Sequence, residues 1–578
     1  MPGALDARNR ESAIQALAEG PLDVLVIGGG ITGAGAALDA ASRGLRVGLV
    51  ESRDLAAGTS SRSSKLIHGG LRYLEQGDFK LVKEALRERD LLVSRLAPHL
   101  VRPLPFLFPL YKKVVERPYV GAGLVLYDAM EGVKRPVPHH RHLTTRGALR
   151  RAPALRPDRL AGAMVYYDAQ VDDARYTVTV ARTAARHGAR IVTRASAVTL
   201  LRDGARVTGA VVRDEESGRT FDVRASAVIV CAGVWSDLVH EASGVRAGYQ
   251  VRMSKGVHLV VPRTAIDADT GMIVRTSKSV LFFIPWDSRW IVGTTDTDWS
   301  GDRAEPAATA EDVDYLLREA NRVLARPLTR ADVLAVYAGL RPLVAAPPAD
   351  SRAEDKVSGA EKPTTKLSRE HVVDTPLPGL ASIAGGKFTT YRLMARDVVD
   401  AAVAGLPRPV PPSVTGQLPL LGADGLPAVL ASAGRLAADY DVPPAVAGHL
   451  ITRYGTLATE VLDLVSADKT LGRPLLDGYP YLRAEVAYAV THEGALHAED
   501  VLARRVRLLI ESSDAGLAAA PEVVAVMAGL LGWNRRRRAA ELRRYQDSAN
   551  ANVAALAPAP PAPPAAPAAA AEPVSVPA

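Results

Sequence analysis

The sequence is poor in cysteine, with one thiol, Cys231, in 578 residues. A single thiol cannot form a disulfide within the chain, so the composition excludes a disulfide-stabilised fold and fits a reducing compartment. Cys231 ends an apolar, strand-like run, and we expect it to be a small buried side chain. No serine stands in a G-x-S-x-G elbow either, so covalent hydrolase chemistry lacks its nucleophile.

Long apolar runs are also missing. The most apolar early stretch, residues 23–39, is too short to cross a bilayer and is interrupted by five glycines. We therefore expect neither a transmembrane helix nor a signal peptide. With 48% hydrophobic residues the chain can form several cores, and its length indicates roughly two to four domains.

Two stretches resemble metal-binding motifs, but their residues do not have the spacing that those motifs require. His492 and His497 are separated so that the second histidine of an H-E-x-x-H pattern would fall on Leu496. We expect both histidines to be solvated on a helix. The acidic run from Asp296 begins like a calcium loop, but its twelfth position is Ala307 and not a bidentate glutamate. The sequence therefore predicts no metal site.

The charge balance is basic, with 71 basic against 63 acidic residues for a net charge of +8. This excess favours anionic partners such as nucleic acid, acidic lipid or a phosphorylated substrate. Zinc fingers, single-strand stacking patterns and long basic arms are absent, so we expect no nucleic-acid partner.

A βαβ unit is expected near the start of the chain. LDVLVI at 22–27 predicts a buried parallel strand, residues 28–44 predict a turn and a helix, and LRVGLV at 45–50 predicts the next strand. Further alternating strands between residues 189 and 233 and between 256 and 296 indicate two sheets formed by one chain.

Between strand and helix, Gly28, Gly30 and Gly33 form G-x-G-x-x-G. The first glycine permits a tight turn, the second lets the backbone approach a pyrophosphate at the helix N-terminus, and the third lets helix and strand pack closely. Glu51 ends the second strand, where a carboxylate accepts hydrogen bonds from ribose hydroxyls and repels a 2′-phosphate. The motif therefore predicts a dinucleotide site that takes FAD or NAD and not NADP, and redox chemistry.

Other segments have distinct patterns. A helix is expected from residue 171 onward, capped by Asp172 or Asp173. Residues 345–363 have little apolar content and should form a mobile surface loop.

The end of the chain changes in composition. From about residue 410 to 552 the pattern is helical, with a charged amphipathic stretch at 481–509. Residues 555–578 are rich in proline and alanine and should form a disordered tail.

Eight motifs follow one another along the chain: GGGITGAG, TSSRSSKLIHGGLRYL, YYDAQVDDAR, KGVHLVVP, FFIPW, IVGTTDTD, YAGLRPL and GGKFTTYR. In this order the sequence resembles the FAD-dependent glycerol-3-phosphate dehydrogenases, the respiratory, quinone-linked family, over residues 23–550. The resemblance implies an α/β, glutathione-reductase-like FAD fold of the D-amino-acid-oxidase branch, with an antiparallel-sheet substrate domain and a C-terminal helical domain.

The implied domains are discontinuous. The FAD-binding domain would span 20–405, in the pieces 20–100, 165–240 and 365–405. The substrate domain would be inserted as 101–164 and 241–364, and the helical domain would span 410–552.

The family oxidises sn-glycerol 3-phosphate to dihydroxyacetone phosphate by hydride transfer to FAD and passes the electrons to a membrane quinone. The resemblance thus implies this substrate, this cofactor and a quinone partner, and a cytoplasmic enzyme peripherally associated with the inner face of the cell membrane. It leaves room for a homodimer. A glycerol-3-phosphate oxidase that uses oxygen is the alternative. Another flavin amine or hydroxy-acid oxidase is a second one, disfavoured because an amino-acid substrate would not need so many cations, and a flavin-binding scaffold without activity is a third.

A membrane surface could be formed by residues 101–127, which combine aromatic and leucine side chains with Lys112, Lys113 and Arg117. That mixture suits a membrane interface. An ordinary wall of the substrate domain explains it equally well.

The resemblance also assigns site residues. A phosphate dianion needs fixed cations, and the family's pocket cations correspond to Arg72, Arg341, Arg369 and Lys387, with Tyr73 as a hydroxyl donor. The expected FAD-binding residues are Gly28, Gly29, Gly30, Ile31, Thr32, Gly33, Glu51, Thr59, Ser60, Ser61, Ser64, Lys65, Leu66, His68, Val198, Gly233, Gly386 and Thr389.

Two residues are expected to act on the reacting oxygen. His258 would take the proton of the C2 hydroxyl, because an ordinary histidine pKa near 6.5 suits a base at neutral pH. Arg341 would hold the oxygen as it gains charge.

Overall fold

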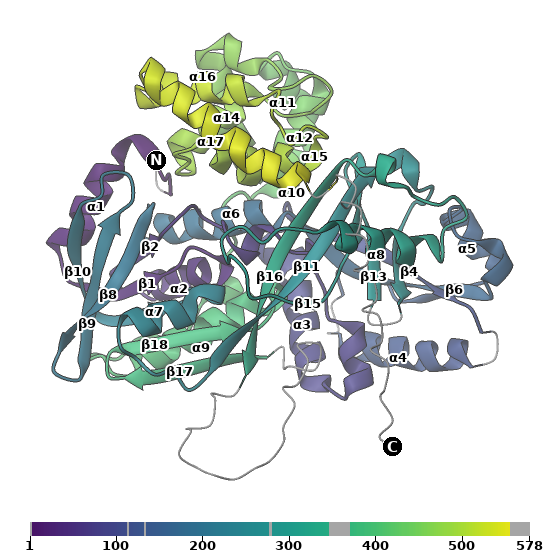
Figure 1. The fold of residues 1–578 in the computed structure, drawn as a ribbon, viewed down its shortest axis with the longest axis horizontal. Coiled ribbons are helices and arrows are strands. Elements are labelled where there is room, and N and C mark those ends of the chain that lie inside the picture. Colours follow the sequence, from purple (N-terminus) through teal and green to yellow (C-terminus); the bar gives the residue numbers. More distant parts are fainter. Residues whose placement is uncertain are drawn as a thin grey trace, which may run out of the picture.

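The computed structural model describes residues 3–112, 115–131, 135–276, 280–345, 370–554 and 556, without the side chains of Arg72, Gln76 and Asn552. The expected surface loop at 345–363 and the Pro/Ala tail at 555–578 lie outside the described residues except for Ala345 and Leu556. Two sheets flanked by helices make up the body of the molecule, and a group of helices follows at the C-terminal end (Figure 1).

The first sheet has a parallel centre. Strand β1 pairs in parallel with β2 on one side and with β10 on the other, and β7 and β18 extend the parallel order next to β2 and β10. Strand β17 pairs antiparallel to β18, and a β8–β9 hairpin joins β10. The strands are β1 (Leu22–Ile27), β2 (Val47–Glu51), β7 (Arg190–Thr193), β8 (Ala195–Asp203), β9 (Arg206–Asp214), β10 (Thr220–Val230), β17 (His371–Leu377) and β18 (Leu380–Gly385).

Strand β1 is buried on both faces. Val24 and Val26 face the core formed with helices α2 (Ile31–Ser42), α6 (Asp173–Arg186) and α9 (Tyr391–Val403). Leu25 and Ile27 face the core formed with α1 (Arg10–Glu19) and the β8–β9 hairpin. A strand covered on both sides gains from apolar residues at successive positions, which is why LDVLVI is so apolar. The predicted strand, helix and strand are confirmed as β1, α2 and β2.

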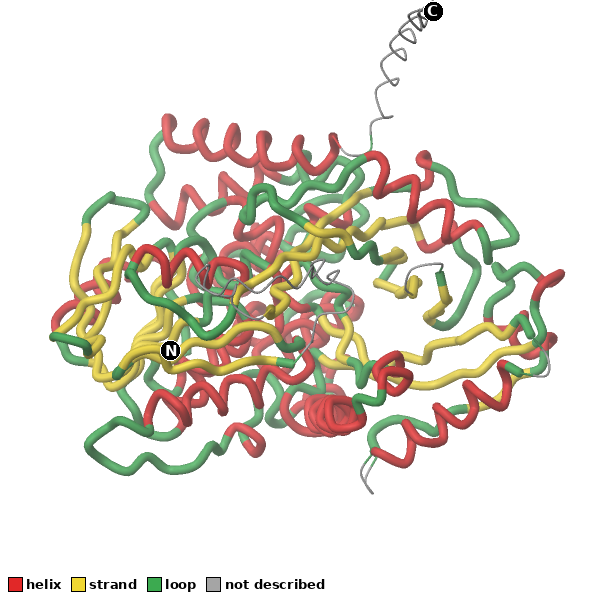
Figure 2. The backbone as a smooth tube through the Cα atoms, turned by 60° about the horizontal axis from the view of Figure 1, so that its bottom comes forward, coloured by secondary structure: helices red, strands yellow, loops and turns green. Residues whose placement is uncertain are grey.

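The second sheet is antiparallel except where β4 meets β12. Leu259 and Val261 pack toward α5 (Thr145–Arg151) and α8 (Ala310–Asn321), whereas Val260 packs toward α3 (Phe79–Leu91) and α4 (Glu116–Met130). Figure 2 shows the two groups of strands side by side, with helices along the outside. The strands are β3 (Leu66–Ile67), β4 (Val101–Leu110), β5 (Arg141–Leu143), β6 (Gly162–Val171), β11 (Gln250–Pro262), β12 (Gly271–Arg275), β13 (Val280–Trp286), β14 (Arg289–Gly293), β15 (Thr297–Asp298) and β16 (Ala335–Ala345).

The expected helix after residue 171 is confirmed as α6. Its N-cap is Asp172, whose carboxylate accepts a hydrogen bond from the Arg175 backbone N–H at 3.2 Å. The cap satisfies one of the amide groups that a helix N-terminus leaves without a partner. Cys231 is buried, as expected, and burial raises the pKa of its thiol to about 12.

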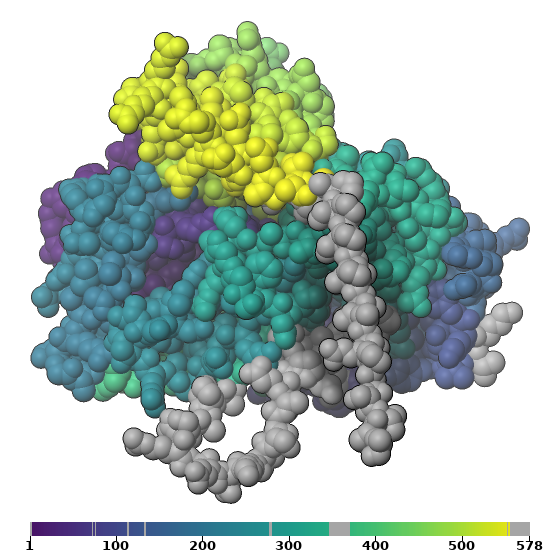
Figure 3. Space-filling view, viewed as in Figure 1, coloured from purple at the N-terminus to yellow at the C-terminus, as the bar shows by residue number. Residues whose placement is uncertain are grey.

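The region after residue 410 is helical, as expected, within the described residues. It contains α10 (Leu426–Ala431), α11 (Ala433–Asp439), α12 (Pro444–Tyr454), α13 (Ala458–Ala467), α14 (Arg483–His492), the π-helical turn η14 (Asp500–Arg505), α15 (Leu508–Glu511), α16 (Ala520–Leu531) and α17 (Arg535–Ala554). We call α10–α17 the C-terminal helices. They form a separate lobe, green to yellow, above the two sheets (Figures 1 and 3).

One expectation for this region is wrong. His497 is 1% exposed and not solvated, because its ring nitrogens lie 2.7 Å from a Glu216 carboxylate oxygen and 2.9 Å from one of Glu541. Glu216 belongs to the turn between β9 and β10, and Glu541 to α17. The stretch 481–509 therefore buries much of its charge against distant segments and does not present it to water.

Candidate functional site

A cavity of about 520 Å³ lies where the two sheets meet. Its lining comes from the glycine turn after β1, the ends of β2 and β10, the segment 57–68, β11, β16 and the segment 385–389. The predicted site residues that line it are Gly28, Gly30, Ile31, Thr32, Glu51, Thr59, Ser60, Ser64, Leu66, His68, Tyr73, Gly233, His258, Arg341, Gly386, Lys387 and Thr389.

The glycine turn has the geometry that its motif predicts. Gly28 has φ +112°, a conformation that glycine adopts without strain, and a Cβ there would lie 2.6 Å from the carbonyl oxygen of Cys231. A Cβ at Gly33 would collide with the carbonyl oxygen of Gly28. Helix α2 starts at Ile31, so the partial positive charge of its N-terminus opens toward the cavity, where the Ile31 N–H donates to Ser60 Oγ at 2.9 Å.

Glu51 stands at the end of β2 and lines the cavity. Its carboxylate accepts hydrogen bonds from the backbone N–H of Gly29 at 2.6 Å and of Arg53 at 2.7 Å. Burial raises the pKa of this carboxyl group, and the two N–H donors oppose the rise. Glu51 thus ties the glycine turn to the loop after β2, in the position where a dinucleotide presents its ribose hydroxyls.

At the other end of the cavity, β11 and β16 carry the expected catalytic residues. Gly256 lies directly opposite Gly339 in the antiparallel pair. His258 is two positions along β11 from Gly256, and Arg341 is two positions along β16 from Gly339. Because side chains alternate along a strand, all four positions face the same side of the sheet. The two glycines let neighbouring groups lie directly on the strands, since a Cβ at Gly256 would lie 2.5 Å from Arg341 Nη2 and one at Gly339 would collide with the Arg62 carbonyl oxygen.

His258 is held closely. Its side chain is 2% exposed, its ring stacks on that of Tyr337 with centroids 4.7 Å apart, and its Nε2 lies 2.8 Å from Ser64 Oγ. Burial lowers the pKa of His258 well below 6.5, and the positive charges of Arg341 and Lys65 lower it further. The imidazole is therefore neutral at pH 7 and can accept a proton, but the ordinary pKa near 6.5 expected from the sequence is wrong for this buried ring.

Arg341 is fixed by several acceptors. Its guanidinium donates to Thr294 Oγ1 at 3.1 Å, to the Thr295 carbonyl at 3.2 Å and to Ser254 Oγ at 3.3 Å, and it lies 3.5 Å from Asp296. Its side chain keeps 23% exposure and lines the cavity. These contacts hold the guanidinium group of Arg341 at the cavity wall.

A second cation, Lys387, lines the cavity. Lys387 Nζ lies 3.7 Å from the centre of the Tyr73 ring, and both residues line the cavity. The segment 385–389, which contains Lys387, is hydrogen-bonded to His68. The His68 backbone N–H donates to Thr389 Oγ1 at 3.1 Å. Arg72 lies next to Tyr73 in the 3-10 turn η3 (Leu71–Gln76), but its side chain is outside the described residues, as is all of Arg369.

Five of the predicted FAD-binding residues lie outside the cavity wall, although they flank it in sequence: Gly29, Gly33, Ser61, Lys65 and Val198. Lys65 is fully buried behind the wall, where its ammonium group forms an ion pair of 2.7 Å with Asp173. Burial lowers the pKa of Lys65 to about 8, and the neighbouring Arg507 adds to the effect. Val198 is 41% exposed on β8, three residues after the lining residue Ala195.

Sequence reasoning misses some contributors. Trp235 lines the cavity, and a Cβ at Gly58 would lie 2.9 Å from its ring. Tyr337 supports His258, and Asp173 accepts hydrogen bonds from Ser63 N and Oγ. The pattern around Asp173 predicts only a helix cap. One sequence feature could have revealed the facing glycines of β11 and β16. KGVHL and YAGLR each place a glycine two positions before the expected catalytic residue.

The residues present fit a bound FAD. A helix N-terminus at a glycine turn suits a pyrophosphate, and a strand-end carboxylate suits a ribose. The cavity continues from there to His258 and Arg341, which leaves the far end for the ring that exchanges electrons with a substrate. Within the described residues, no group of three histidine, cysteine or acidic side chains is placed to hold a metal ion.

Comparison with known families decides the class. Residues 23–392 match the family of FAD-dependent oxidoreductases, and residues 413–538 match the C-terminal domain of alpha-glycerophosphate oxidase. The glycerol-3-phosphate dehydrogenase of Mycobacterium leprae is 52% identical over 550 residues, which cover 95% of this chain and 92% of that one. The chain belongs to the FAD-dependent glycerol-3-phosphate dehydrogenases. FAD is its cofactor, as the resemblance implies, and it is one of the two dinucleotides that the glycine motif and Glu51 allow.

Solved structures agree on the fold. The crystal structure of a glycerol-3-phosphate dehydrogenase from Bacillus halodurans, complexed with FAD, has a TM-score of 0.77 and 29% identity, and covers 96% of this chain and 99% of that one. The predicted fold class is confirmed. An L-alpha-glycerophosphate oxidase from Mycoplasma pneumoniae shares the fold at 18% identity and a TM-score of 0.51, over 69% of this chain and 99% of that one. The shared fold does not distinguish dehydrogenase from oxidase.

Proposed function

We propose that this chain oxidises sn-glycerol 3-phosphate to dihydroxyacetone phosphate and passes the electrons to a membrane quinone. The observation that carries the proposal is one cavity that joins a dinucleotide turn to a neutral histidine and two cationic side chains, Arg341 and Lys387. A small dianionic alcohol fits this end of the cavity, because fixed cations favour a phosphate and a neutral imidazole can accept a hydroxyl proton. Names of related enzymes support the choice of substrate.

The proposed roles combine the resemblance with the contacts described above. Lys387 and Tyr73 bind the phosphate, joined by Arg72 and Arg369, whose positions remain predictions. His258 accepts the C2 hydroxyl proton while Arg341 holds the oxygen, which carries developing negative charge as the proton leaves. FAD, when bound, supplies the hydride acceptor. The negative charge of the phosphate bound in the same cavity partly offsets the positive charges that lower the pKa of His258, so substrate binding makes the imidazole a stronger base.

Peripheral attachment to the inner face of the cell membrane is part of the proposal, since a quinone resides in the bilayer. No helix in the described ranges is both long and apolar enough to cross a membrane. Helix α4 exposes apolar side chains, with Tyr119 at 56% and Val125 at 58%, and Phe79 of the neighbouring α3 is 48% exposed. This surface lies on the side of the molecule opposite the C-terminal helices (Figure 1). An apolar patch of this kind suits an interfacial contact.

The experiment is anaerobic addition of glycerol 3-phosphate to the purified yellow holoenzyme, followed by a menaquinone or ubiquinone analogue or by oxygen. We expect the flavin absorbance to fall on substrate addition and to recover faster with quinone than with oxygen. Full FAD occupancy without bleaching would contradict the substrate assignment. Fast recovery with oxygen and release of peroxide would instead support the oxidase alternative.

A further inference from the structure

The segment 500–511 of the C-terminal helices is charged and almost completely buried. Arg504, Arg505 and Arg507 have side chains that are 3%, 0% and 1% exposed. Arginine is rarely buried without a partner, because removing its charge from water is costly. Each of the three arginines has a partner in one of two loops that line the FAD cavity, although none of the described residues that line this cavity comes from the C-terminal helices.

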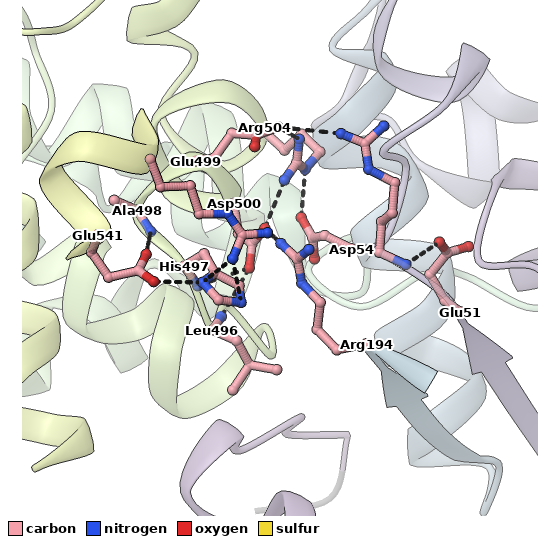
Figure 4. A network of polar contacts seen from close by, with 12 residues as sticks. Glu51, Asp54, Arg194, Leu496, His497, Ala498, Glu499, Asp500, Arg504 and Glu541 are labelled. Carbon is pink, nitrogen blue, oxygen red and sulfur yellow. Dashed lines mark hydrogen bonds and ion pairs between the residues drawn. The ribbon is translucent and has the colours of Figure 1, made fainter. Parts of the chain in front are cut away.

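The first loop follows β2 and contains Asp54, which is fully buried. Its carboxylate accepts hydrogen bonds from Arg504 Nε at 2.5 Å and from both terminal nitrogens of Arg505 at 2.8 Å. Figure 4 shows Arg504 between Asp54 of this loop and Asp500 of its own segment, which it contacts at 2.7 Å. The fork of Arg505 thus fixes the orientation of the Asp54 carboxylate.

Asp54 is directly connected to the cofactor residues. Its carbonyl accepts the N–H of Ala57, and the N–H of Ala56 donates to the carbonyl of Gly29 in the glycine turn. Glu51, three residues before Asp54, accepts from Gly29 as well. The loop 51–58 therefore carries the ribose-binding carboxylate at one end and cavity-lining residues at the other, with the arginine contact between them.

The second loop, 60–65, is held in the same way. Arg507 donates to the Ser61 carbonyl at 3.1 Å and lies 3.3 Å from Asp173. Asp173 in turn accepts from Ser63 and pairs with Lys65. Cavity-lining residues 60, 63 and 64 belong to this loop, so its conformation also depends on a C-terminal arginine.

We propose that Arg504, Arg505 and Arg507 are positioning residues of the FAD site, and that docking of the C-terminal helices and retention of FAD are thermodynamically coupled. Docking orders the loops 51–58 and 60–65 in their FAD-binding conformation. By reciprocity, bound FAD stabilises the docked arrangement of the segment 500–511 by the same factor.

The test measures FAD release from the full-length holoenzyme on dilution, followed by the rise of free-flavin fluorescence. For Arg505→Met and Asp54→Asn we expect an FAD dissociation constant about tenfold higher, a coupling of ordinary size for linked sites. The matched control is Arg182→Met. Arg182 of α6 is also buried and donates to Tyr488 of α14 at 2.7 Å, but it contacts neither loop. It should change FAD affinity less than threefold, or about 0.65 kcal/mol.

Equal weakening in the control and in the loop variants would overturn the proposal, because it would show a general effect of loosened helices. Unchanged FAD affinity in Arg505→Met and Asp54→Asn would overturn it as well. If Arg505→Met does not fold, hydrogen exchange of the wild type decides. FAD should slow exchange at amides 500–511 relative to flavin-depleted full-length protein, although these residues do not line the cavity. Identical exchange in the two states would refute the coupling. Neither measurement depends on the substrate proposed above.

Discussion

His258 illustrates how a single residue depends on its immediate neighbours. Its pKa is lowered because the ring is buried and faces the positive charges of Arg341 and Lys65. Its Nε2 is hydrogen-bonded to the Ser64 hydroxyl group. Among the described residues, His258 Nδ1 has no hydrogen-bond partner. Ser64 is therefore the polar contact that fixes the orientation of the ring, and its hydroxyl also lines the cavity.

Replacing Ser64 by alanine should lower the rate of flavin reduction by glycerol 3-phosphate about tenfold, since the base loses its orientation. KM should change little because the cations stay in place. Stopped-flow absorbance under anaerobic conditions measures the rate, and the holoenzyme spectrum reports FAD content. Ser196→Ala, at a cavity-lining position on β8, is the matched control. Equal reduction rates in both variants would remove Ser64 from this role.

A second histidine predicts how stability depends on pH. His99 is 4% exposed, and burial, with the nearby Arg102, lowers its pKa from 6.5 to about 3. The unfolded chain binds a proton at this residue below pH 6.5, whereas the folded protein does so only near pH 3. The free energy of unfolding should therefore fall as the pH drops through this window, by about 1.4 kcal/mol per pH unit.

Urea denaturation of wild type and His99→Gln between pH 7 and 4 tests this dependence. As the pH falls, the free energy of unfolding of the variant should decrease less steeply than that of the wild type, by about 1.4 kcal/mol per pH unit. His139→Gln, which removes an imidazole that is 71% exposed, serves as the comparison. Parallel curves for wild type and His99→Gln would contradict the prediction.

At the scale of elements, the paired strands β11 and β16 form the wall of the cavity at the end that contains His258 and Arg341. Gly339 allows the backbone of Arg62 to pack against β16, because a Cβ at this position would collide with the Arg62 carbonyl oxygen and lie 2.9 Å from the Arg62 Cβ. The backbone of the segment 60–65 thus rests directly on β16. This contact brings Ser64 to His258.

Gly339→Ala should destabilise the protein by about 1–3 kcal/mol and weaken FAD binding, since overpacking displaces the segment. Gly434→Ala is a suitable control in helix α11, because no described atom lies within 4 Å of the position that a Cβ would take there. That change should be neutral or stabilising by up to about 1 kcal/mol. Differential scanning calorimetry and flavin content measure both effects. A stable, fully flavinated Gly339→Ala protein would contradict the packing argument.

The sequence predicts the elements whose cause is local. LDVLVI, the glycine turn and the Asp172 cap depend on periodicity and on neighbouring residues, and β1, α2 and α6 form as expected. The buried His497 could not be recognised, because its partner Glu216 is 281 residues away. Likewise, the burial of Lys65 depends on Asp173, 108 residues distant. Charge burial is decided by tertiary partners, and a pattern of single residues contains no information on them.

At the scale of the whole molecule, the exposed apolar surface of α3 and α4 lies opposite the C-terminal helices (Figure 1). The same helix α4 is anchored inside by Tyr127, whose hydroxyl lies 3.0 Å from the Gly69 N–H and 2.6 Å from Asp168. Its outer face can therefore be changed without disturbing the core contact.

Tyr119→Glu combined with Val125→Glu should reduce binding to vesicles of phosphatidylglycerol and phosphatidylcholine at least about fivefold, because two charges would have to enter the interface. Sedimentation with the vesicles measures binding. Leu430→Glu, which alters a 56% exposed leucine on α10, should bind like wild type. Equal binding by the double variant and wild type would exclude this surface as the membrane contact.

The separation between Asp54 and Arg504, 450 residues, also has a consequence for biosynthesis. A ribosome adds roughly 5–20 residues per second, so the nascent chain exists for about 20–90 s before the partners of Asp54 emerge. Throughout that interval the Asp54 carboxylate must remain hydrated, and the loop 51–58 cannot adopt its final packing. Flavin loading is therefore expected to be a late event, completed only after the last helices have been synthesised.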